Sequence, residues 1–178
     1  MIIVLLAEGF EEIEALTPVD MLRRAGLDVR TVGIAGREIK GSHGITVRCD
    51  MTDEELLIGD IDMAIFPGGM PGALNLDSSP LTDKIIEAVT RRGGHLAAIC
   101  AAPLVLGRRG LLAGKRAVCY PGFESELVGA EIADAPVVTD GNITTARGMG
   151  VALEFSKELV RIAVSPARAE ELSRAIIE

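Results

Sequence analysis

The segment His95–Pro103, with the sequence HLAAICAAP, most constrains how this chain can fold. An apolar run ends at Cys100, and Ala98 and Ala102 lie two residues before and after this cysteine. Small residues at these spacings are typical of a nucleophile elbow, a sharp strand-to-helix turn that exposes its central side chain above a sheet. The alternative interpretation is an ordinary buried cysteine at a strand end, because free cysteines are among the most buried residues.

Strands and helices are predicted to alternate along the chain, as in an α/β doubly wound sheet that is mostly parallel. Continuous apolar runs indicate strands buried on both faces. The predicted strands cover 2–7, 27–34, 62–66, 95–99, 116–120 and the hairpin 136–146. The predicted helices cover 11–25, 52–57, 79–92, 122–129, 151–164 and 166–176. With 178 residues and no linker, we expect a single domain over residues 1–178.

Charge and cysteine content limit the possible partners. The formal net charge of −8 argues against nucleic acid and anionic membranes, because phosphate groups need clustered Lys and Arg. No apolar run reaches transmembrane length. Three cysteines without a C-x-x-C pair favour a reducing cytoplasm over a disulfide framework. Cys49 and Cys119 lack partners at metal-ligand spacing, so no metal site is expected.

Polar residues follow three of the predicted strands at their C-terminal ends, where ligands bind in such sheets. Glu14 lies in the first turn of a helix on its inward face, where burial raises a carboxyl pKa and allows proton transfer. Gly68 and Gly69 offer unobstructed amides for an oxyanion hole. We expect them to meet Cys100, whose thiolate a helix N-terminus would favour. The PGGMPG loop has no phosphate-binding spacing, so no nucleotide cofactor is expected.

The two histidines offer little support for a Cys-His hydrolase. His95 opens the strand that Cys100 closes, so about five residues of strand place it roughly 16 Å from the thiol. His43 lies in a glycine-rich region and would reach Cys100 only through loop placement or from another subunit. A peptidase or amidase therefore depends on His43 alone.

Several segments together resemble the DJ-1/ThiJ/PfpI superfamily, in its DJ-1-like branch. The matching segments are AEGFEEIEA with PVD (7–20), RRAG (23–26), FPGG with GA-x-NL (66–76), AAICAAP (97–103) and TARGMG with EF (145–155). The resemblance implies a flavodoxin-like sandwich and a homodimer. It implies a reactive Cys100 with Glu14 as its protonated partner, an anion site at the Gly69 and Ala101 amides, and Arg24 and Arg147 around the site and the dimer contact.

The activities that the resemblance implies need no cofactor. They are glyoxalase and deglycase reactions on methylglyoxal, glyoxal and their adducts, which are small reactive carbonyl compounds. Redox sensing or a chaperone-like stress role is the main alternative, and a peptidase or a link to thiazole biosynthesis are further ones. Tyr120 replaces a histidine that many relatives carry beside the site, and Ala101 replaces the histidine that follows the nucleophile in PfpI peptidases.

Overall fold

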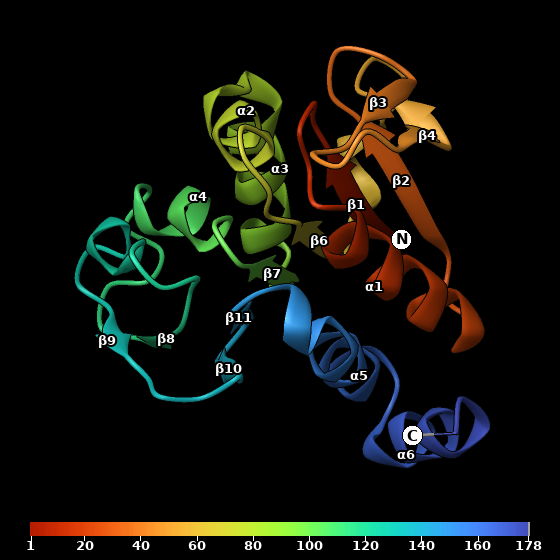
Figure 1. Cartoon of the computed structure of the whole chain (residues 1–178), viewed down its shortest axis with the longest axis vertical. Coiled ribbons are helices and arrows are strands. Elements are labelled where there is room, and N and C mark those ends of the chain that lie inside the picture. The colour runs from red at the N-terminus through yellow and green to blue at the C-terminus, as the bar shows by residue number, and fades with distance from the viewer. Residues whose placement is uncertain (178) are drawn as a thin grey trace.

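The computed structural model describes residues 1–177 and contains a seven-stranded sheet with helices on both faces (Figure 1). Five parallel strands make its centre, in the spatial order β2-β1-β6-β7-β11. They are β1 (Ile2–Leu6), β2 (Val29–Gly33), β6 (Met63–Phe66), β7 (His95–Ile99) and β11 (Ile143–Ala146). This is the flavodoxin-like strand order, so the predicted fold class is confirmed.

Short strands complete the two edges and form two separate pairs. At the edges, β5 (Met51–Thr52) lies parallel to β2, and β10 (Val137–Asp140) lies antiparallel to β11. The separate pairs are the antiparallel hairpin of β3 (Glu38–Lys40) and β4 (Thr46–Arg48), and the parallel pair of β8 (Arg116–Ala117) and β9 (Glu131–Ile132). The β3–β4 hairpin projects beyond the sheet above β2 (Figure 1).

Two helical layers bury the faces of the sheet. One layer holds α1 (Glu12–Arg24), α5 (Ala152–Ala163) and α6 (Pro166–Ala175), and the other holds α2 (Gly72–Ser78), α3 (Pro80–Arg91) and α4 (Pro103–Gly107). Ile3 and Leu5 of β1 pack into the core beneath α2–α4, whereas Val4 and Leu6 pack beneath α1 and α5. Burial on both faces explains why β1 is apolar without alternation. Within residues 1–177, no helix is both long enough and apolar enough to cross a membrane.

Three local predictions were wrong. Residues 52–57 form no helix, because Met51–Thr52 pairs with β2 and the Glu55 carboxylate binds the Thr52 amide at 2.8 Å, which fixes a turn. The strand predicted at 116–120 ends at Ala117, since the Val118 amide donates to Thr145 Oγ1 instead of to a neighbouring strand. Residues 122–129 contain only the 3-10 turn Glu124–Glu126.

Helix α2 was not predicted. Its seven residues follow the glycine-rich loop directly, and the first turn contains glycine. Two further 3-10 turns, Ile58–Asp60 and Met149–Val151, lead into β6 and α5.

Candidate active site

Loops from four parallel strands meet at the C-terminal edge of the sheet. The Glu11 amide after β1 donates to the Gly68 carbonyl after β6 at 2.9 Å. The Cys100 amide after β7 donates to the Ala146 carbonyl at the end of β11, also at 2.9 Å. A Cβ atom built on Gly148, in the next loop, would lie 3.9 Å from the Cys100 sulfur. The structure thus brings together the segments that the sequence placed at one edge.

Cys100 occupies the sharp turn between β7 and α4. Its φ of +64° lies in the left-handed region, which non-glycine residues seldom adopt and which is typical of functional sites. Ala101 and Ala102 are buried beside it, and the Tyr120 amide donates to the Cys100 carbonyl at 2.8 Å. Cys100 is partly exposed, whereas Cys49 and Cys119 are buried. This geometry is that of a nucleophile elbow.

Glu14 reaches the same point from the first turn of α1, with no solvent exposure. Its Oε2 accepts a hydrogen bond from the Gly68 amide at 2.9 Å, and the carboxyl group also interacts with the Cys100 thiol. Its Oε1 has no well-aligned partner among the described residues. Oε1 and the Cys100 sulfur both lie 3.9 Å from the Cβ position of Gly148. Both atoms therefore border the small space in front of Gly148.

The buried surroundings raise the pKa of both groups. Burial raises the pKa of the Glu14 carboxyl to about 7, although its hydrogen bonds from Cys100 and Gly68 oppose the shift. Burial and then the Glu14 charge raise the pKa of the Cys100 thiol to about 12. Two adjacent negative charges are disfavoured. Glu14 and Cys100 together therefore lose one proton near neutral pH and retain the second.

The expected effect of a helix N-terminus on the thiol is therefore wrong. Helix α4 has only five residues, and burial outweighs the amides of Gly69 and Ala101, which do lower the thiol pKa. The amides of Gly69 and Ala101 thus lie next to the sulfur. The Gly68 amide instead donates to Glu14.

Tyr120 and Arg147 border an open pocket beside the site. The Cβ position of Gly148 lies 3.4 Å from the Tyr120 ring, and Tyr120, Arg147, Gly148 and Met149 line the pocket. The Arg147 guanidinium lies 3.5 Å from a carboxylate oxygen of Asp134 and is half exposed. Both side chains line this pocket, and Gly148 joins it to the neighbourhood of Cys100.

Arg24 and His95 lie elsewhere in the chain. Arg24 is in the last turn of α1, ten residues or about 15 Å beyond Glu14, and it pairs with Asp20 at 2.7 Å. His95 begins β7 and bonds Thr144 Oγ1 at 2.8 Å, so it lies at the opposite end of the strand from Cys100. Its exclusion as a catalytic base is consistent with this position.

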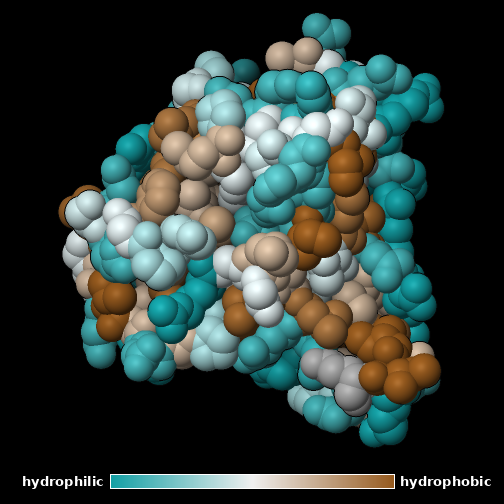
Figure 2. Space-filling model, in the orientation of Figure 1, coloured by the Kyte–Doolittle hydropathy of each residue, from teal (hydrophilic) through white to brown (hydrophobic). Residues whose placement is uncertain are grey.

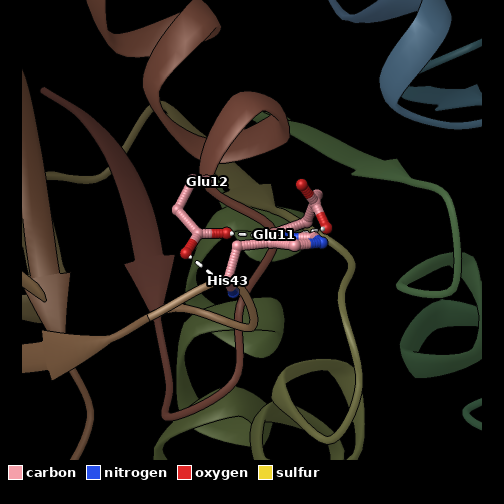
Figure 3. A group of neighbouring side chains, drawn as sticks. All are labelled: Glu11, Glu12 and His43. Atoms are coloured by element: carbon pink, nitrogen blue, oxygen red, sulfur yellow. Dashed lines mark hydrogen bonds and ion pairs between the residues drawn. The ribbon is translucent and has the colours of Figure 1, made fainter. Parts of the chain in front are cut away.

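His43 lies against Glu11 and Glu12, in the loop between β3 and β4 (Figure 3). One donor atom from each of these residues lies within 4.8 Å of the others, an arrangement that can hold a metal ion. The expectation of no metal site considered only the cysteines. His43 is about 30 positions from Glu11 and Glu12 in the sequence, and the β3–β4 hairpin brings it to them. No motif with a fixed spacing could therefore have indicated this cluster.

Comparisons with known proteins agree with this geometry. The family model described as "DJ-1/PfpI family" matches residues 1–162. "Protein dj-1beta" of Drosophila melanogaster is 33% identical over 98% of this chain and 95% of its own length. The crystal structure of Drosophila melanogaster DJ-1beta superimposes with a TM-score of 0.94 at 32% identity, covering 99% of this chain and 96% of that chain.

Two other relatives carry names that describe an activity. "Deglycase PYRAB04690" of Pyrococcus abyssi is 30% identical over 90% of this chain and 98% of its own length. "Glutathione-independent glyoxalase DJR-1.2" of Caenorhabditis elegans is 29% identical over 98% of this chain and 94% of its own length. With a family model over most of its length, and relatives over 30% identical across it, the chain belongs to the DJ-1/PfpI family.

Proposed function

We propose that this protein is a cofactor-independent cysteine enzyme that converts 2-oxoaldehydes such as methylglyoxal, and their early adducts, into hydroxy acids. The observation that carries this proposal is the buried Glu14 carboxyl beside the partly exposed Cys100 thiol. The relatives named deglycase and glutathione-independent glyoxalase support the same class of reaction.

The shared proton gives the pair a chemical role. The Glu14 carboxylate accepts the thiol proton as the Cys100 sulfur attacks the aldehyde carbon, which forms a hemithioacetal. The amides of Gly69 and Ala101 stabilise the negative charge at the reacting centre. Glu14 then carries a proton from the aldehyde carbon to the neighbouring carbonyl carbon, and the resulting thioester is hydrolysed. The net reaction adds one water to methylglyoxal and gives lactate, so no external oxidant or reductant is consumed.

Lactate formation from methylglyoxal without glutathione tests this mechanism. We expect Cys100→Ser and Glu14→Gln each to lower kcat/KM by at least about 100-fold, because each removes one partner of the proton transfer. Cys49→Ala is the matched control and keeps the activity, since Cys49 is buried against Thr31 and Gly33 of β2. A Cys100→Ser variant with more than half of the activity would contradict the mechanism.

Redox sensing at the same thiol is the second candidate. Cys100 is partly exposed, whereas Cys49 and Cys119 are buried, so peroxide in solution can reach the Cys100 sulfur most easily. Mild peroxide should therefore oxidise Cys100 selectively, as followed by mass spectrometry. Selective oxidation without measurable turnover would favour a sensor over an enzyme. Equal oxidation of all three thiols would argue against both roles for this site.

We also propose a homodimer and a cytoplasmic location. Figure 2 shows hydrophobic surface among hydrophilic side chains on the side where α1 and α6 lie, and Ile13 and Leu16 of α1 are partly exposed. Such apolar surface is a candidate for contact with a second copy. The three unpaired cysteines are in keeping with a reducing compartment. A peptidase reaction is less well supported, because His43 contacts Glu11 and Glu12.

A further inference from the structure

Donor atoms from two segments converge where the β3–β4 hairpin meets the start of α1. Glu11 directly precedes α1, Glu12 is its first residue, and His43 comes from the hairpin loop (Figure 3). Ser42, the neighbour of His43 in that loop, joins the same cluster. The Glu12 side chain is only 5% exposed, whereas the His43 ring is 70% exposed. A buried carboxylate therefore lies beneath an imidazole that solvent can reach.

Five distances between these donor atoms are in the range of a tetrahedral metal site. Ser42 Oγ lies 3.1 Å from Glu11 Oε2, 3.4 Å from Glu12 Oε2 and 3.1 Å from His43 Nδ1. His43 Nδ1 lies 3.2 Å from Glu12 Oε2 and 3.4 Å from Glu11 Oε2. A tetrahedron with ligand bonds of about 2.0 Å, as zinc has with nitrogen and oxygen, has edges of about 3.3 Å.

Hydrogen bonds alone do not account for five such contacts. With a neutral histidine, the hydroxyl of Ser42 and the Nδ1 of His43 together supply at most two hydrogens. These five contacts therefore share too few hydrogens, which leaves a proton-poor group of oxygen and nitrogen donors. A cation at its centre would satisfy all of them.

The surrounding backbone holds Glu12 in a ligating position. Its Oε1 accepts hydrogen bonds from the amides of His43 at 2.9 Å and Ile45 at 3.3 Å, which leaves Oε2 to face the other donors. Gly41 makes room for the carboxyl group, because a Cβ atom there would lie 2.3 Å from Oε1. Outer hydrogen bonds of this kind fix the orientation of metal ligands.

We propose that Glu11, Glu12 and His43 form a binding site for a divalent cation of the zinc class. The Ser42 hydroxyl or a water molecule would supply the fourth ligand. Mixed imidazole and carboxylate donors in tetrahedral arrangement suit Zn²⁺ better than Mg²⁺ or Ca²⁺, which prefer six or more oxygen ligands. The site is separate from Cys100 and does not depend on the proposed reaction.

Zinc titration of the full-length protein tests the proposal, with calorimetry and competition against a chromophoric chelator as readouts. Zinc can also bind the Cys100 thiol, so the titration is repeated in a Cys100→Ser background. We expect one zinc ion per chain to remain in that background. His43→Ala and Glu11→Gln, both at exposed or partly exposed positions, should each weaken this binding at least tenfold.

Glu8→Gln is the matched control, because it removes the same charge from the same loop without changing the cluster. It should leave the zinc affinity unchanged within a factor of two. Anomalous diffraction from zinc-soaked crystals should place the ion between Glu11, Glu12 and His43. An affinity that is insensitive to His43→Ala in the Cys100→Ser background, a stoichiometry of zero in that background, or the absence of an anomalous peak between Glu11, Glu12 and His43 would overturn the proposal.

Discussion

Gly68 lies against both members of the proposed catalytic pair. A Cβ atom at this position would lie 2.6 Å from Glu14 Oε2, 2.7 Å from the Cβ of Cys100 and 2.9 Å from the Ile99 carbonyl. These neighbours have little room to move, since Glu14 and Ile99 are fully buried and Cys100 is held in the sharp turn after β7. We expect Gly68→Ala to lower the free energy of unfolding by about 2 kcal/mol through overpacking. It should also lower kcat/KM at least tenfold, because the carboxyl group is displaced from the thiol.

Gly59→Ala is the control for this substitution. Gly59 has no atom within 4 Å of its Cβ position and does not have a positive φ. Urea unfolding and lactate assays on both variants give the comparison. Equal effects of the two substitutions would contradict the crowded geometry around Gly68.

At the scale of elements, serine begins two of the helices but caps only one of them. The Ser165 hydroxyl accepts a hydrogen bond from the Arg168 amide at the start of α6, whereas Ser79 makes no such bond at the start of α3. We expect Ser165→Ala to cost about 1 kcal/mol of stability, as the loss of an N-cap does. Ser79→Ala should cost less than half of that in the same urea unfolding experiment. A larger loss at Ser79 would contradict the assigned caps.

The long elements could be predicted from the sequence because burial shapes their pattern directly. Strands β1, β6 and β7 are buried throughout, and each gives a continuous apolar run. Short elements depend on contacts that are distant in sequence. Residues 116–120 have the composition of a strand, but the amides of Val118 and Tyr120 bind Thr145 and Cys100 instead. Only the folded chain determines where those hydrogen bonds go.

In the candidate site, too, local sequence patterns indicated some residues, whereas others depend on contacts between distant segments. Cys100 could be found from its local spacing, and Glu14 from its helical face together with the family resemblance. The contact of Gly68 with Glu14 and those of His43 with Glu11 and Glu12 join residues that are 31 to 54 positions apart. No local pattern encodes such contacts, so sequence reasoning assigned Gly68 to the anion site and expected no metal ligands.

At the scale of the whole molecule, two buried titratable groups at opposite ends of the sheet affect stability in opposite directions. Burial raises the pKa of Glu14 from 4.5 to about 7, so between these values the folded state binds more protons than the unfolded chain. Stability from this group therefore falls as pH rises. Burial lowers the pKa of His95 from 6.5 to about 4, so the unfolded chain binds more protons there. Stability from His95 therefore rises with pH.

Between pH 4.5 and 6.5 both Glu14 and His95 contribute to the pH dependence of the free energy of unfolding. Their two contributions have opposite slopes and cancel there. We expect Glu14→Gln alone to make the free energy of unfolding rise by about 2 kcal/mol across this window, because only the His95 slope remains. His95→Gln, whose amide can still donate to Thr144, should make it fall by a similar amount. The double variant should restore a flat profile. Urea unfolding at fixed ionic strength with a chelator present measures all four proteins, and parallel slopes in the two single variants would refute the assignment.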